Sequence, residues 1–242
     1  MSAIEANPAA WLDVLSRQPG AEVHDGWVVT DVPFALCNSC FFPAWGEDAD
    51  ARVDEVVAAG RERGVPQLWW LGESSTPRDL ADRLRARGLD VVAEELPGME
   101  LDLRELAPVD PVAVRTSDVA LIAEPFCTAY GVPDDAWASL APAFAASRAE
   151  LRHWVVREDG RCVAAASTVV RDGVAGLYNV SVVPDARGRG LGREVSVAAL
   201  AGARDDGAHA AVLHATRDGL PIYERLGFRA VERVWTVATV ML

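Results

Sequence analysis

Hydrophobic and polar positions in the second half of the chain change from a strand pattern to a helix pattern within a short stretch. Residues 177–183 form an apolar, β-branched run that predicts a buried strand. Pro184 ends it, because proline offers no N–H to a strand ladder. After Gly192 the apolar residues of 195–203 recur at helical spacing. The pattern therefore predicts a strand, a turn and a helix in direct succession.

The elements around this stretch form a meander followed by a crossover. An Asp-Gly turn at 158–160 predicts a hairpin between two apolar strands. The expected elements are strand 112–115, helices 118–130 and 134–147, strands 151–156, 162–170 and 174–183, a helix after 192, strand 210–215 and a short helix from 221.

The first half of the chain repeats the end of the second half. Both contain a helix, a strand, a short helix that ends in glycine and an apolar residue, and two closing strands. Gly88 matches Gly227 at an offset of 139 residues, and the same offset carries Leu103 onto Leu242. An internal repeat is informative about architecture even when identity is low. The expected elements are helix 8–17, strands 27–30 and 34–37, helix 50–63, strand 67–71, helix 77–87 and strands 91–92 and 99–103.

This repeat predicts two domains, residues 1–104 and 112–242. Between them, residues 105–111 contain two prolines and read as a linker. The alternative interpretation of residues 1–104 is an unrelated α/β cap.

The turn at 187–193 alternates arginine and glycine, which favours binding of an anion. Glycine tolerates torsions that point several N–H groups at one spot. The following helix adds its unpaired first-turn N–H groups and positive dipole end, so a pyrophosphate is a typical ligand. A Walker loop would need Gly-Lys-Ser/Thr, and the dinucleotide fingerprint would need glycine at Arg193, so neither fits. An ordinary glycine-rich turn is the alternative.

Two motifs together resemble the GNAT superfamily of acetyl-CoA-dependent N-acetyltransferases. The first is Arg-x-x-Gly-x-Gly at 187–192, and the second is the segment 221–228, which carries Tyr223 and ends in Leu-Gly-Phe. The resemblance covers roughly residues 112–242. It implies an α/β (α+β) fold with two lobes, each a mixed, mostly antiparallel sheet flanked by helices.

The first half departs from the family pattern at the cofactor site. Glu47 and Asp48 lie before its 50–63 helix, where acidic groups would repel a pyrophosphate. Leu84 stands at the position equivalent to Tyr223. We therefore expect residues 1–104 to be a degenerate GNAT-like domain that has lost the cofactor and packs as a second subunit would.

The resemblance also implies roles for residues of the second half. In the family, backbone groups of the fourth strand pair with pantetheine, and one N–H can polarise the thioester oxygen. Tyr223 matches the family's general acid, with a packing tyrosine as the alternative. Thr216 replaces an asparagine that contacts the cofactor in many members. The implied cofactor-binding residues are Val180, Ser181, Val182, Arg187, Gly188, Arg189, Gly190, Leu191, Gly192, Arg193 and Thr216.

The identity of the general base is open at this point. Many members use a glutamate on the fourth or fifth strand, but the fourth strand here has no carboxylate. His214 lies near the position of the fifth-strand glutamate, and an ordinary histidine pKa of about 6.5 would suit a base. A structural histidine, or proton transfer to water without an external base, is the alternative. Weaker candidates are Glu124, His153 and Tyr178.

Composition narrows the classes of partner. A formal net charge of −13 argues against nucleic acid and anionic membranes. No apolar run reaches the length of a membrane span, and the N-terminus resembles no signal segment, so we expect a cytoplasmic protein. The four cysteines are too scattered for a disulfide framework. Cys37 and Cys40 have metal-like spacing without a second ligand pair, so we expect no metal site.

The expected activity is direct transfer of an acetyl group from acetyl-CoA to a primary amine of an unidentified, small-molecule acceptor. An acyl-CoA-binding sensor without turnover is the alternative. A Rossmann-type nucleotide-binding protein is disfavoured by the glycine spacing. Both a monomer, with its halves as a pseudo-dimer, and a homodimer stay open.

Overall fold

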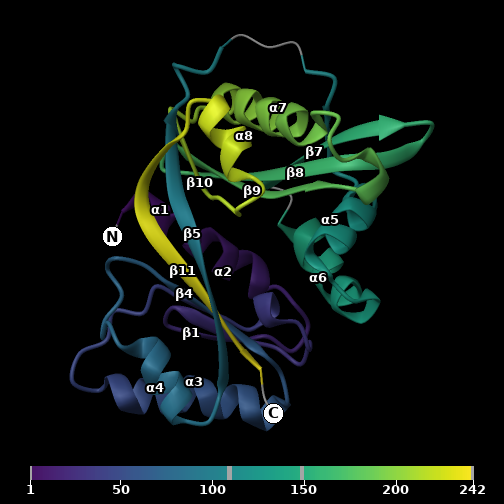
Figure 1. Ribbon diagram of the computed structural model, residues 1–242. Coiled ribbons are helices and arrows are strands. Elements are labelled where there is room, and N and C mark those ends of the chain that lie inside the picture. Colours follow the sequence, from purple (N-terminus) through teal and green to yellow (C-terminus); the bar gives the residue numbers. More distant parts are fainter. Residues whose placement is uncertain (1, 108–110, 148–149, 241–242) are drawn as a thin grey trace. The chain divides into compact units, whose positions relative to one another are not determined.

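The computed structural model describes residues 2–107, 111–147 and 150–240, and the chain divides into two compact units (Figure 1). The first unit comprises Met1–Leu96 together with Glu232–Leu242, and the second comprises Pro97–Val231. Each unit has its own run of paired strands and its own apolar core.

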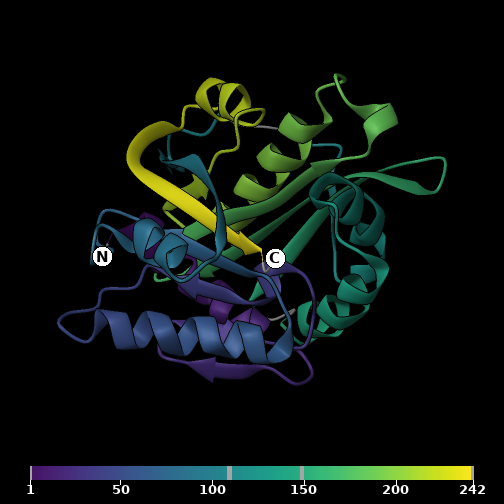
Figure 2. The same cartoon turned by 60° about the horizontal axis from the view of Figure 1, so that its bottom comes forward.

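In the first unit the strand order is β1-β2-β3-β4-β11, with β3 and β4 parallel and the other neighbours antiparallel. Helix α3, which Figure 2 brings forward, buries Val53, Val56 and Val57 in one core with Trp69. This spacing places the three valines on one helix face. The elements are α1 (Ala3–Ala6), α2 (Ala9–Leu15), β1 (Glu22–His24), β2 (Trp27–Val29), β3 (Ser39–Phe41), α3 (Ala49–Arg63), β4 (Gln67–Leu71) and α4 (Leu80–Ala86), with parts of β5 (Asp90–Asp102) and β11 (Arg229–Val240).

In the second unit the order is β5-β10-β9-β8-β7-β6, with β9 and β10 parallel and the printed neighbours otherwise antiparallel. Helices α7 and α8 lie on one face of these strands, and α5 and α6 on the other (Figure 1). The elements are β6 (Val114–Thr116), α5 (Ala123–Tyr130), α6 (Asp134–Ala146), β7 (Leu151–Glu158), β8 (Arg161–Arg171), β9 (Val174–Val182), α7 (Leu191–Asp205), β10 (Ala210–His214) and α8 (Leu220–Arg225), with 3₁₀ turns η1 (Ala35–Cys37, in the first unit), η2 (Val119–Ile122) and η3 (Pro184–Ala186).

These mixed, mostly antiparallel sheets with flanking helices confirm the predicted α/β (α+β) class. The predicted strand 34–37 is wrong, because the chain forms a 3₁₀ turn there and the strand begins at Ser39. The buried Asn38 amide explains the difference. Its Nδ2 donates to the carbonyls of Val32 and Phe34, and its Oδ1 accepts from the Thr30 N–H. These bonds hold a compact turn where a ladder was expected.

The predicted helix 77–87 also begins later, at Leu80. The preceding loop is held by other partners. Ser75 Oγ accepts from the Gly72 N–H at 3.0 Å, and the Thr76 N–H donates to the Pro43 carbonyl at 2.9 Å. Because these bonds fix the backbone in a turn, the first helical residue moves three positions along the chain.

The closing strands are exchanged between the two halves of the sequence. Trp235–Thr239 of β11 pairs antiparallel with β4 in the first unit, and Gly98–Asp102 of β5 pairs antiparallel with β10 in the second. The compact units therefore differ from the expected domains 1–104 and 112–242. The proposed match of Leu103 with Leu242 ends outside the described residues.

The expected linker at 105–111 is only partly described, since residues 108–110 lie outside the described chain. Its Leu106 is buried in the core of the second unit. This part of the segment is thus packed.

Candidate functional site

Strands β9 and β10 begin as neighbours and then part. Their parallel register joins Val174, Ala175 and Gly176 to residues 210–212, and among the described residues it stops there. The segment 177–182 of β9 therefore has a sheet edge facing β10 without a strand partner. Such an edge can pair with an extended ligand.

A β-bulge lies on the same part of β9. Ser167 of β8 is opposite Tyr178, whereas Ala165 is opposite Ser181, so β9 holds an extra residue. Asn179 takes a positive φ of 55° there, and its Nδ2 donates to Ser167 Oγ at 3.4 Å. Bulges re-aim backbone groups next to functional sites. The three residues predicted to hold pantetheine, Val180, Ser181 and Val182, follow this bulge directly.

The glycine-rich turn has the backbone that an anion site needs. Gly190 is the N-cap of α7 with φ 82°, and Gly188 has φ 75°. A Cβ at either position would meet no atom within 4 Å, so the torsion and not crowding favours glycine. The first helical bond runs from the Glu194 N–H to the Gly190 carbonyl. The N–H groups of residues 191–193 thus precede the helical ladder as first-turn donors.

The three arginines of the turn differ in their partners. Arg187 Nε donates to the Val182 carbonyl at 3.1 Å, which ties the turn to the end of β9. Arg193 is exposed and has no ion pair within the described chain. Arg189 donates to both oxygens of Glu158 at 2.9 and 2.6 Å. Hydrogen bonding by Arg189 lowers the pKa of Glu158.

Tyr223 lies on α8 beside this turn and is 8 % exposed. Burial raises the pKa of its phenol, the nearby Tyr130 raises it further, and a hydrogen bond with Ser196 acts in the opposite direction. Thr216 and the Tyr223 ring both approach Gly219, where an added Cβ would lie 3.2 and 2.9 Å from them. The structure therefore brings Tyr223 and Thr216 together at Gly219.

Tyr130 and Ser196 belong to the same neighbourhood and were missed in the sequence. The Tyr130 hydroxyl donates to the Val180 carbonyl at 3.4 Å, beside the bulge. Although 43 % of Tyr130 is exposed, desolvation of its phenol raises the pKa to about 12. Ser196 follows Gly192 by one helical turn and donates to its carbonyl at 2.7 Å. In the sequence, only the one-turn spacing between Gly192 and Ser196 could have indicated that Ser196 belongs to this site.

His214 ends β10, half-buried and opposite Gly98 of β5. Its neighbours Leu213 and Ala215 pack in the same core as Tyr223. Because successive strand residues point to opposite faces, His214 lies on the face away from Tyr223. The structure does not bring these two predicted catalytic residues together on one face.

Two of the weaker base candidates, Glu124 and His153, already contact other side chains. Glu124 accepts from Arg161 at 2.6 Å, and this hydrogen bond lowers the pKa of Glu124. His153 is 1 % exposed, and burial lowers its pKa to about 4, so its ring is neutral at neutral pH. His153 Nδ1 lies 2.8 Å from Ser167 Oγ, which also accepts from Asn179. The polar row of His153, Ser167 and Asn179 thus supports the bulge of β9.

The described residues hold no cluster of metal ligands and no membrane-spanning helix. No group of three His, Cys, Asp or Glu side chains is placed to hold a metal ion there. Cys37 and Cys40 are buried free thiols, and burial raises the pKa of Cys37 to about 12. Each described helix is too short or too polar to cross a bilayer.

Comparisons of sequence point to one family for the segment that carries the site. The model of the acetyltransferase (GNAT) family matches residues 120–228. Mycothiol acetyltransferase from Arthrobacter sp. (strain FB24) is 44% identical over 55 residues, which are 22% of this chain and 17% of that protein. Glucosamine 6-phosphate N-acetyltransferase from Trypanosoma brucei brucei is 35% identical over 81 residues, 31% of this chain and 55% of that protein. The matches thus span about half or less of these curated relatives.

Comparisons of structure cover nearly the whole chain. A GCN5-related N-acetyltransferase from Kribbella flavida has a TM-score of 0.69 at 21% identity, covering 99% of this chain and 96% of that chain. A tandem GNAT protein from the clavulanic acid biosynthesis pathway has a TM-score of 0.60 at 14% identity, covering 96% and 94%. The chain therefore has the fold of GNAT proteins. The family model supports a GNAT acetyltransferase assignment for the segment 120–228.

Proposed function

We propose that the second unit transfers an acetyl group from acetyl-CoA to a primary amine of a small-molecule acceptor. The observation that carries the proposal is the parting of β9 from β10 directly beside the glycine-rich N-terminus of α7. An unpaired strand edge and an anion site side by side suit a ligand with an extended arm and a pyrophosphate.

The residues of this site fit such a ligand. Positive φ at Gly188 and Gly190 opens the turn, and the N–H groups of residues 191–193 can donate to phosphate oxygens. Arg187 and Arg193 would add charge, and Thr216 would offer a hydroxyl near Tyr223. Acetyl-CoA would supply the activated thioester. The backbone of 180–182 would hold its arm, and an N–H after the bulge would donate to the carbonyl oxygen.

In the transfer, the amine nitrogen bonds to the acetyl carbon, the carbon–sulfur bond breaks, the sulfur gains a proton and the amine loses one. Tyr223 keeps its proton at neutral pH, because burial raises the pKa of the phenol. Its hydroxyl can therefore donate to the departing sulfur. His214 would take the amine proton, directly or through water, from the other face of the sheet.

Two measurements test this function. Calorimetric titration with acetyl-CoA should show binding, and a panel of primary amines should release free thiol in a manner that Tyr223→Phe slows. Binding without amine-dependent release would favour the acyl-CoA sensor, which the missing carboxylate on β9 keeps as the second candidate. Absence of binding would refute both.

For the first unit we propose a degenerate GNAT-like role without a cofactor site. Its β3 and β4 pair up to Phe41 and Trp70, and the Phe42 N–H still donates to the Trp70 carbonyl at 2.8 Å. Glu47 and Asp48 lie before α3, where the second unit has its glycine-rich turn. The likeness to a tandem GNAT protein supports a chain built from two related halves. Sedimentation of the purified chain would separate a monomeric pseudo-dimer from a homodimer.

A further inference from the structure

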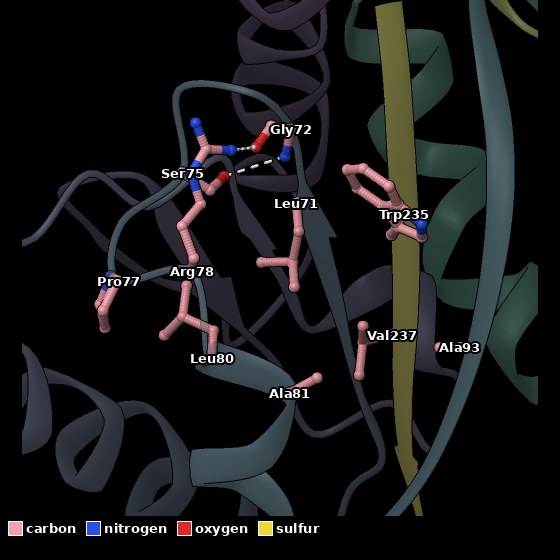
Figure 3. Close-up of a pocket in the computed structure, with 10 residues that line it drawn as sticks. All are labelled: Leu71, Gly72, Ser75, Pro77, Arg78, Leu80, Ala81, Ala93, Trp235 and Val237. Carbon is pink, nitrogen blue, oxygen red and sulfur yellow. Dashed lines mark hydrogen bonds between the residues drawn. The ribbon is translucent and has the colours of Figure 1, made fainter.

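A cavity of about 270 Å³ lies within the first unit (Figure 3). Its walls come from the end of β4, the loop after it, the start of α4, and the strands β5 and β11. Apolar side chains dominate the lining, with Leu71 and Leu80 facing Trp235 and Val237 across the cavity. Its volume lies just below the lower end of about 300 Å³ for pockets of drug-sized ligands, so it suits only a smaller molecule.

Arg78 is the charged side chain of this lining. It is exposed, and its guanidinium makes one long hydrogen bond, 3.5 Å from Nη1 to the Gly72 carbonyl. Among the described residues it has no carboxylate partner. By contrast, Arg83 on α4 and Arg87 at its C-cap each pair with two aspartates at 2.6–3.1 Å. The Arg78 guanidinium thus lies beside the cavity with most of its donors available to an anionic group.

The loop that carries Arg78 is held in place before any ligand arrives. Ser75 Oγ accepts from the Gly72 N–H, and Thr76 bonds to Pro43 and, through its hydroxyl, to the Trp45 carbonyl at 2.9 Å. These bonds join the loop to the segment after β3. A preformed wall reduces the entropy lost on binding.

We propose that this cavity binds a small organic anion whose apolar body lies against Trp235 and Leu80 and whose carboxylate pairs with Arg78. Arginine presents a planar fork of donors that matches a carboxylate, and its five N–H groups are mostly unused here. The apolar walls supply the affinity for a ring or short chain, and the guanidinium selects the negative charge. This site does not depend on acetyl transfer in the second unit.

Ligand-observed NMR and calorimetry with 4-phenylbutyrate test the proposal on the full-length chain. The uncharged amide of the same shape, 4-phenylbutyramide, is the matched probe. We expect the carboxylate to bind about tenfold more tightly than the amide, because hydrogen bonds to charged groups are the stronger ones. Arg78→Ala should remove this preference, whereas Arg85→Ala, which breaks an exposed pair with Asp82 on the same helix, should preserve it.

A second variant tests the cavity itself. Ala93 is an exposed lining residue on β5, so Ala93→Trp can fill the space with little risk to folding. It should abolish binding of both probes while the melting temperature stays within a few degrees of the parent. Equal affinity for acid and amide, or binding that survives Ala93→Trp, would overturn the proposal. So would an unchanged preference in Arg78→Ala.

Discussion

Each unit contains one parallel pair of strands, and the two pairs differ in how far they stay hydrogen-bonded. In the second unit, β9 leaves β10 after Gly176 and a bulge follows at Asn179. In the first, β3 stays paired with β4 to its last residue. A strand edge open to a ligand in one unit is thus occupied by main-chain hydrogen bonds in the other. The proposed cofactor site of the second unit thus depends on an open strand edge, and in the first unit the paired β3 and β4 leave no such edge between them.

Gly190→Val should have the largest effect on this contrast. A β-branched residue is strained at φ 82°, so the turn would have to rearrange. Its N–H groups would then no longer point toward one bound anion. We expect acetyl-CoA affinity to fall more than 100-fold, measured by calorimetry, with an unchanged far-UV circular dichroism spectrum. The matched control is Gly207→Val, because Gly207 has φ 97° and equally open surroundings at the other end of α7.

The same titration gives a stoichiometry. We expect one acetyl-CoA per chain in the parent protein and none in Gly190→Val. A second molecule that remains bound in the variant would place a cofactor site in the first unit. That result would break the comparison between an open and a closed strand pair.

Tyr223→Phe should reduce turnover about 100-fold, the lower end of what general acid catalysis contributes. Acetyl-CoA affinity should change less than threefold, since the ring and its contact with Phe228 remain. Thiol release under saturating acetyl-CoA and amine measures the effect. Thermal unfolding of the variant is the control. An unchanged melting temperature with reduced turnover would support the general acid, whereas a lowered melting temperature would argue for a structural role of the hydroxyl.

The polar row beneath the bulge predicts a pH dependence of stability. His153 has a folded pKa of about 4 and an unfolded value near 6.5. The unfolded state therefore binds more protons as the pH falls from 6.5 to 4, and the folded state loses up to about 3 kcal/mol of stability in this window. Urea unfolding at several pH values measures the loss. His153→Gln should flatten this part of the profile, and an unchanged profile would show that other groups dominate.

Local chemistry made part of this site predictable. Proline at 184 restricts the backbone, and glycine at 188 and 190 permits the positive φ of a turn, so the strand, turn and helix could be placed from residue type. The exchange of closing strands could not, because the pairing of β11 with β4 depends on which apolar edge is available after collapse. Tyr130 reaches the Val180 carbonyl only through the tertiary packing of α5, which no spacing in the sequence encodes.

The smallest expected effect concerns Glu158, which holds Arg189 in an exposed ion pair. A bound pyrophosphate would have to compete with this carboxylate for the guanidinium. Glu158→Gln should therefore tighten acetyl-CoA binding about twofold to fivefold, as expected for an exposed pair, and added salt should shrink the difference. Glu124→Gln breaks a pair of similar exposure with Arg161, outside the glycine-rich turn, and should leave the affinity unchanged. If both variants bind equally, Arg189 takes no part in holding the pyrophosphate, and the anion site rests on the backbone N–H groups with Arg187 and Arg193.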